Sequence, residues 1–336
     1  MILRKSRGFS IVELMVSIAL GTLIIATVGE IYLSNRTTNT IQAALARLQE
    51  NGRYANFLLS KELRMAGYHG CGNQSKINTT NLVSNQPNLS DYDIAIKGYD
   101  GLSSSFSPSL PTYLTANPVP GNDVLEIRMA SFHGVNLTSD MNQTNNPVLV
   151  DDRLGIQAGE IVMITDCSVA DIFEAGANTN ATAITHTVSN NTSNHLSIPY
   201  LTNAQVMRFF YYAFYIKDTG RTNAQGQPIL ALYRQDINGV EEEIAEGVEQ
   251  MQITYGVDTN GDRAADSYQS AAQVNSANNW NSVISVNINL LFATIENVNT
   301  KAESYTFNGT TVTPSDRKLR RQWNTFVTLR NRGLPG

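Results

Sequence analysis

The feature that most restricts the fold of this chain is an apolar run near its N-terminus. Between Phe9 and Val28, Glu13 is the only charged residue. A helix over this run would be about 30 Å long at about 1.5 Å per residue, which matches the hydrocarbon core of a bilayer. The sequence therefore predicts one membrane-spanning helix at the start of the chain.

The residues just before the run predict its orientation and its processing. Arg4, Lys5 and Arg7 lie there, so the positive-inside rule keeps the N-terminus in the cytoplasm and exports the rest of the chain. An ordinary signal peptide would end in a small-residue cleavage site, but here the helical pattern continues past the run. A cleavage point lies before it instead, between Gly8 and Phe9, because glycine lets a protease approach the backbone. Cleavage there would leave the apolar helix attached to the mature protein.

The glutamate inside the run needs a reason to be there. A carboxylate at the centre of a membrane helix costs about 2.5 to 3.5 kcal/mol on insertion scales, and less near the interface, where Glu13 lies. A new α-amino group at Phe9, on the same chain or on a neighbour, would attract it by about 4 kcal/mol at about 4 Å and an effective dielectric constant of about 20. We therefore expect Glu13 to pair with a cationic terminus and to set the axial register of packed helices. The alternative is a carboxylate that snorkels to the interface without a partner.

The rest of the chain has the composition of a folded, exported body. It is 42% hydrophobic and only 16% charged, which is typical of a globular protein and not of a disordered tail. The net charge of −5 disfavours nucleic acid as a main partner, since phosphate binding needs a surplus of basic residues. The two cysteines, Cys71 and Cys167, are predicted to form one disulfide in an oxidising compartment, with two unpaired buried thiols as the alternative.

Two patterns beyond the span predict the fold class. Apolar or small residues recur at steps of three and four and extend the helix to about Met65: Ile41, Leu45, Leu48, Gly52, Ala55, Leu59 and Leu63. Alternating or aromatic-rich runs predict mostly antiparallel strands over 123–132, 159–167, 207–218, 229–237, 248–258, 283–295 and 324–332. Long surface loops are expected at 107–120 and 176–195. The expected class is α+β, with a long helix, half transmembrane and half amphipathic, packed on a mostly antiparallel β-sheet head.

One loop, DTNGDRAAD, has the pattern of a cation site. Oxygen donors at alternate positions can wrap a calcium ion, and the donors here would be Asp258, Asn260, Asp262, the Ala264 carbonyl and Asp266. Arg263 stands where an EF-hand loop has glycine, and no glutamate closes a twelfth position. The alternative is a hairpin turn built on Asn260-Gly261 with solvated aspartates. Calcium is thus a candidate ligand, and no other cofactor is expected.

No convergent catalytic set is visible, so we do not expect an enzyme. The four histidines are scattered without ligand spacing, and there is no G-x-S-x-G or glycine-rich phosphate loop. The acidic run at 241–243 is interpreted as a solvated loop. The basic C-terminal segment ends in NTFVTLRNR, where alternation puts Phe326 and Val327 on opposite faces of a terminal strand.

The N-terminal string K-x-R-G-F-S-I-V-E-L-M-V-S-I-A-L resembles the class III leader of type IV pilins and of type II secretion pseudopilins. That resemblance implies that a prepilin peptidase cuts after Gly8 and methylates the Phe9 amine, and that Glu13 meets the terminal amine of an adjacent subunit. The stretches NGRYANFLLSKELRMAGYHGCG, EGVEQMQITYGVD and RRQWNTFVTLRNRG are similar to PilW-type minor pilins. The expected parts are a leader at 1–8, a transmembrane and assembly helix at 9–33, its amphipathic continuation at 34–68, and a periplasmic or extracellular head at 69–336.

The resemblance implies a minor pilin that acts in the initiation of type IV pilus assembly or in the tip complex, and so in motility, adhesion or DNA uptake. The implied partners are other minor pilins and pseudopilin-like subunits, a large tip adhesin, the prepilin peptidase and the inner-membrane assembly platform. The implied location is the inner membrane, in a single pass, before assembly and the extracellular pilus tip afterwards. Two alternatives stay open: a J-type pseudopilin of type II secretion, and a membrane-tethered, calcium-dependent adhesin that does not polymerise.

Overall fold

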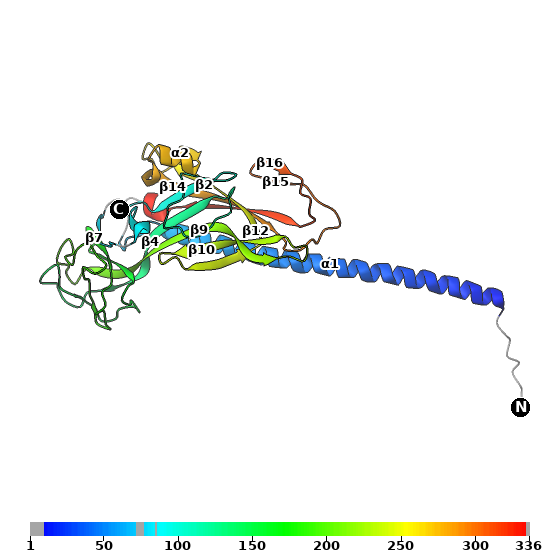
Figure 1. The fold of residues 1–336 in the computed structure, drawn as a ribbon, viewed down its shortest axis with the longest axis horizontal. Helices are drawn as coiled ribbons and strands as arrows, with labels where there is room; N and C mark the ends of the chain where they lie inside the picture. The colour runs from blue at the N-terminus through cyan, green and yellow to red at the C-terminus, as the bar shows by residue number, and fades with distance from the viewer. Residues whose placement is uncertain (1–9, 72–76, 85, 334–336) are drawn as a thin grey trace, which may run out of the picture.

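A single long helix and a β-rich head make up the computed structural model, which describes residues 10–71, 77–84 and 86–333. Helix α1 runs without a break over Ile11–Met65, and its first half projects from the head (Figure 1). No proline occurs before Pro87, so no residue in this stretch removes a helical hydrogen bond. The helix ends where Ala66 becomes extended and Gly67 takes a positive φ of 69°. The predicted helix end near Met65 is confirmed.

The head follows α1 and contains short helices among many strands. In chain order its elements are β1 (Asn78–Asn81), a 3-10 turn (Pro87–Leu89), β2 (Ile96–Gly101), β3 (Phe106–Ser107), β4 (Val124–Asn136), β5 (Val148–Leu149), β6 (Ile161–Thr165), β7 (Val169–Glu174), β8 (Ala183–Ile184), β9 (Gln205–Thr222), β10 (Pro228–Asp236), β11 (Glu241–Glu246), β12 (Val248–Val257), β13 (Ser267–Gln269), α2 (Ala271–Ser276), a 3-10 turn (Trp280–Ser282), β14 (Val283–Ala293), β15 (Tyr305–Phe307), β16 (Thr310–Val312), β17 (Arg320–Thr328) and α3 (Arg330–Gly333). Every run predicted as a strand overlaps one of these strands.

Two sheets form the body of the head, and nearly all of their pairs are antiparallel. The larger is nine-stranded in the order β1-β7-β6-β9-β4-β2-β3, with β10 and β11 attached to β9. Strand β9 is central to this sheet. One of its edges pairs with β4, and the other pairs with β6 in the first part of β9 and with β10 in the rest of it. The smaller sheet has the order β13-β12-β14-β17. Only β1 and β7 pair in parallel among the described residues, so the predicted α+β class is confirmed.

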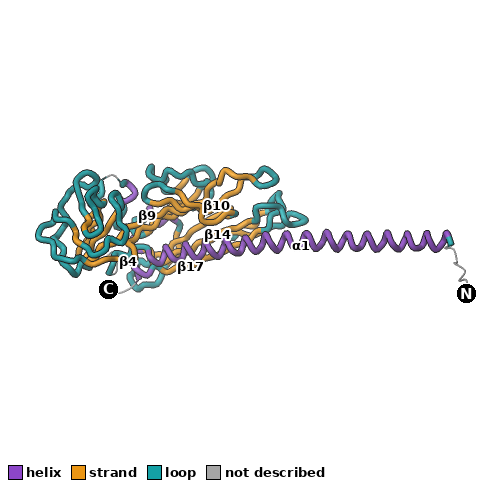
Figure 2. Tube along the Cα trace, turned by 90° about the horizontal axis from the view of Figure 1, so that it is seen from below, coloured by secondary structure: helices purple, strands orange, loops and turns teal. Residues whose placement is uncertain are grey.

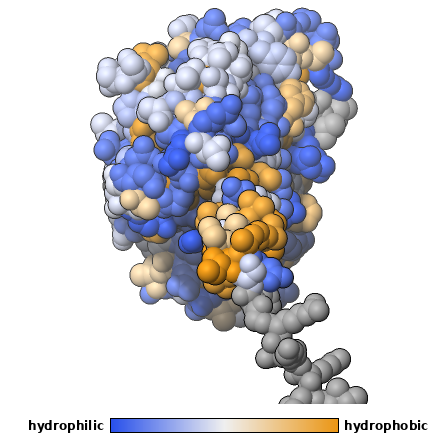
Figure 3. Space-filling model, turned by 90° about the vertical axis from the view of Figure 1, so that its right-hand side faces the viewer, coloured by the Kyte–Doolittle hydropathy of each residue, from blue (hydrophilic) through white to orange (hydrophobic). Residues whose placement is uncertain are grey.

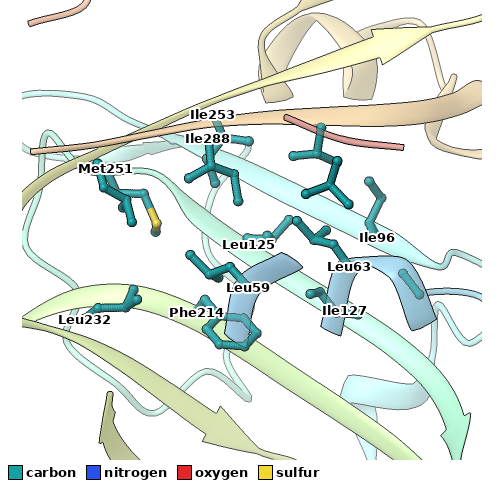
Figure 4. Packing of buried hydrophobic residues seen from close by; sticks show 14 of the residues in the cluster. Leu59, Leu63, Ile96, Leu125, Ile127, Phe214, Leu232, Met251, Ile253 and Ile288 are labelled. Carbon is teal, nitrogen blue, oxygen red and sulfur yellow. The ribbon is translucent and has the colours of Figure 1, made fainter. Parts of the chain in front are cut away.

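The core lies where the two sheets meet the second half of α1. Leu59 and Leu63 are fully buried and point between the sheets, toward residues such as Leu125 and Ile253 (Figure 4). Viewed from below, α1 runs along the outside of the head beside β14 and β17 (Figure 2). The helix therefore closes one side of the core with the apolar stripe that its spacing predicted.

The predicted alternation of β17 is also confirmed. Val327 is 2% exposed and packs in the core, whereas its neighbour Phe326 is 56% exposed on the outer face. Strand β17 pairs only with β14 among the described residues. This terminal strand forms one edge of the smaller sheet and brings Trp323 against the helix.

The acidic run at 241–243 is part of a strand and not the solvated loop that the sequence predicts. It begins strand β11, which pairs antiparallel with β10. Each glutamate has a cationic partner on β9 or β10, in the pairs Glu241–Lys217, Glu242–Arg234 and Glu243–Arg221. Cross-strand pairs of opposite charge favour a strand, so the neighbours on the sheet outweigh the low strand propensity of three consecutive glutamates.

Candidate assembly site

The predicted processing site, Gly8 and Phe9, lies outside the described residues. The described chain begins one residue later with Ser10, the N-cap of α1. Cleavage after Gly8 and methylation of Phe9 therefore stay predictions.

Glu13 takes part in the start of the helix. Its Oε2 accepts a hydrogen bond from the backbone N–H of Ser10 at 3.2 Å, and Ser10 Oγ accepts one from the N–H of Val12 at 3.4 Å. This is a capping box, in which two unsatisfied N–H groups of the first turn find partners. Sequence reasoning missed it, although the pattern S-x-x-E before an apolar run was visible at positions 10–13. The pairing of Glu13 with a cationic terminus stays a prediction.

The first half of α1 is long and apolar enough to cross a membrane. Its apolar side chains are not buried by any residue that the structure describes. Figure 3 looks along the helix from its projecting end and shows apolar side chains gathered there, while the head behind is largely hydrophilic. Such a surface is far larger than the apolar patches that soluble monomers expose, so it needs lipid or other helices around it.

The second half of α1 is fixed to the head by close packing. A Cβ added to Gly52 would lie only 2.7 Å from Cε2 of Trp323, so glycine permits the helix to approach β17 this closely. One turn further on, the Thr325 hydroxyl donates a hydrogen bond to Asn56 Oδ1. These contacts hold the projecting half in a set direction relative to the head.

The predicted disulfide is confirmed. Cys71 and Cys167 are bonded, with their Cα atoms 5.4 Å apart, and they are 96 positions apart in the sequence. Cys71 follows the end of α1, and Cys167 lies in the turn between β6 and β7 with a positive φ of 78°. The bond ties the segment just after the helix to the far end of the larger sheet.

The candidate calcium loop connects β12 to β13, which pair as a hairpin. Its carboxylates accept hydrogen bonds from the loop itself: Asp258 from the N–H groups of Gly261 and Arg263, at 2.6 and 2.8 Å, and Asp262 from the N–H of Ala264 at 2.8 Å. Arg263, at the position where an EF-hand has glycine, takes a positive φ of 70°. The loop thus makes the sharp turn that the sequence put in doubt.

Asn260 lies between two of the loop's carboxylates. Its Nδ2 donates to Asp262 Oδ2 at 3.2 Å and to Asp266 Oδ1 at 3.0 Å. Hydrogen bonds from the Thr259 hydroxyl and N–H lower the pKa of Asp266. In the part of the chain that the structure describes, no three His, Cys, Asp or Glu residues are grouped as metal ligands. Calcium binding, with the Ala264 carbonyl as a further donor, stays a prediction.

Two known families match parts of the chain. Residues 3–29 match the family described as Prokaryotic N-terminal methylation motif, and residues 213–331 match the family described as Type IV Pilus-assembly protein W. No curated protein and no solved structure matches. The second match begins within β9 and includes the whole smaller sheet that packs on α1. Both families are structural rather than enzymatic.

Proposed function

We propose that this chain, a PilW-type pilin by its two family matches, acts in type IV pilus assembly as a minor pilin of the initiating or tip complex. The observation that carries the proposal is the form of α1. One continuous helix leaves an apolar half uncovered and holds its other half rigidly in a folded head. A chain built this way can be stored in a membrane and moved sideways into a bundle of similar helices.

The proposed assembly uses the two halves for different tasks. Packing between apolar helices supplies cohesion, since such helices associate in lipid through close contact. Glu13 supplies register, because an acid in an apolar bundle is stabilised most where a cationic terminus meets it. The surface of the head determines which other subunits it contacts in the assembled complex.

The same proposal covers processing, location and partners. A prepilin peptidase would cut after Gly8 and methylate Phe9. The chain would stay in the inner membrane with a cytoplasmic N-terminus until assembly and then move to the pilus tip. Its partners would be other minor pilins, a large tip adhesin and the assembly platform, and its role would be structural rather than catalytic.

Substitution of Glu13 tests the proposal in cells that lack the native chain. We expect Glu13→Ala to lower the number of surface pili at least tenfold, counted by electron microscopy. Glu30→Ala is the matched control, since Glu30 is the next acid along the same exposed half of α1. Unchanged pilus number with Glu13→Ala would overturn the proposal, and loss of secreted enzymes instead of pili would assign the chain to type II secretion.

A further inference from the structure

The face of α1 that points away from the head carries basic residues around two exposed aromatic rings. We name this surface the Phe57 stripe and define it by Arg47, Arg53, Tyr54, Phe57, Lys61 and Arg64. Phe57 is 64% exposed and Tyr54 49% exposed. Arg53 and Lys61 stand four residues before and after Phe57, so on a helix they flank its ring on the same face.

The stripe is separate from the core contacts of the same helix. Leu58, Leu59 and Leu63, which alternate with the stripe along the sequence, are buried against the two sheets. A side chain that is 64% exposed gains little from packing on the head. Aromatic residues are enriched at protein-binding surfaces.

Most charges of the stripe have no ionic partner among the residues that the structure describes. Arg47, Arg53 and Arg64 make no salt bridge with any residue that the structure describes, and Lys61 reaches only its neighbour Glu62, at 3.8 Å. Glu50 is the single acid on this exposed face. The stripe therefore has a net positive charge on a chain whose overall charge is −5, which makes an acidic partner complementary to it.

Three acidic candidates can be compared. Phe57 lies 24 residues beyond Leu33, the end of the predicted span, which is about 36 Å along a helix and out of reach of lipid headgroups. Nucleic acid is disfavoured because binding a phosphate backbone needs a surplus of basic residues, and the chain has a net charge of −5. A second copy of this chain offers two acidic surfaces, and both are already occupied. The carboxylates of the run at 241–243 are paired with Lys217, Arg221 and Arg234, and those of the loop at 258–266 accept hydrogen bonds within that loop. An acidic surface on a different protein subunit is the remaining match.

We propose that the Phe57 stripe docks an acidic surface of a neighbouring pilin-type subunit. Phe57 fills an apolar depression at the centre of the contact, and Arg53 and Lys61 pair with carboxylates beside it, as aromatic and charged residues do at the centre of other interfaces. The inference rests on the proposed function, because the stripe continues along the helix whose first half would enter the bundle.

A photo-crosslinking residue at position 57 of the full-length chain, in piliated cells, tests this contact. We expect one adduct, with a subunit that carries an N-methylated pilin-type terminus, and a crosslinked peptide rich in Asp and Glu. Position 132 is the control site, since Phe132 is 70% exposed on β4 and outside the stripe. The inference is wrong if position 57 gives no adduct, an adduct with DNA or lipid, or a peptide without acidic residues.

Charge reversal tests the stripe without relying on the crosslinker position alone. With the crosslinker at 57, the double variant R53E/K61E should lower the adduct yield at least tenfold, and the head should unfold at the same denaturant concentration because both side chains are exposed. An unchanged yield contradicts the inference.

If the stripe variant assembles normally while Glu13→Ala does not, the stripe assignment fails and the proposed function stands. If neither changes pilus number, both fail.

Discussion

The two halves of α1 are one helix in two different surroundings. Up to Thr40, almost every side chain is exposed, whatever its hydrophobicity. From Leu48 onward, buried residues recur on one face and join the core of the head. Apolar side chains in the second half stabilise this fold, whereas those in the first half are not buried by any residue that the structure describes. Hydrophobicity alone shows that a helix face avoids water. Only the structure shows whether the head covers that face or whether lipid or another subunit must cover it.

The largest expected effect comes from removing a core leucine of the second half. Leu59→Ala should lower the free energy of unfolding by about 2 to 5 kcal/mol, because Leu59 is fully buried and leaves a cavity. Leu20→Ala, at a position 56% exposed, should change it by less than about 0.5 kcal/mol. Denaturant titration of the full chain in micelles, followed by fluorescence of Trp280 and Trp323 in the head, measures both. Equal effects of the two substitutions on the free energy of unfolding would contradict the conclusion that only the second half of α1 packs in the core of the head.

Removal of the disulfide should have the next largest effect. The double variant C71S/C167S frees a loop of nearly one hundred residues and should destabilise the head by about 2 to 4 kcal/mol. Circular dichroism of α1 in micelles should show the same helix content, since the bond lies beyond the helix end. A loss of helix content in the first half would contradict that independence.

Two glycines of the same helix allow a finer comparison. Gly52→Ala should cost about 1 to 2 kcal/mol, because overpacking against Trp323 exceeds the helical preference of alanine. Gly21→Ala has nothing within 4 Å of the added Cβ and should be neutral or slightly stabilising. The same fluorescence titration measures the free energy of unfolding of both variants. If Gly52→Ala were stabilising, α1 would not approach β17 this closely.

The smallest expected effect concerns the loop from Asp258 to Asp266. If it binds calcium with the affinity of extracellular sites, about 10⁻⁴ to 10⁻³ M, then 1 mM calcium should stabilise the head by about 0.4 to 1.4 kcal/mol. Asp262→Asn should remove the difference between calcium and chelator. The absence of any calcium effect on the native chain would leave the loop as a self-bonded hairpin turn.

Much of the fold could be predicted from local patterns. The helix follows from continuous spacing without proline, and β17 from the alternation of exposed Phe326 and buried Val327. The Ser10–Glu13 capping box is equally local and could have been predicted from the S-x-x-E spacing. Features of this kind depend on residues within a few positions of one another.

The parts that could not be predicted depend on distant residues. The strand at 241–246 is stable because cations of β10 and of β9, the strand beyond it, form ion pairs with its glutamates, and a sequence without strand order cannot show this. The parallel pairing of β1 with β7 likewise joins segments about ninety residues apart. The Phe57 stripe could not be predicted for the same reason. Which face of α1 stays exposed is known only once the positions of both sheets relative to the helix are known.

Mass spectrometry of the mature N-terminus tests the central claim most directly. The account predicts a chain that begins with N-methylphenylalanine at position 9 and still contains the apolar half of α1. A mature chain that begins after Val28, without that half, would contradict it.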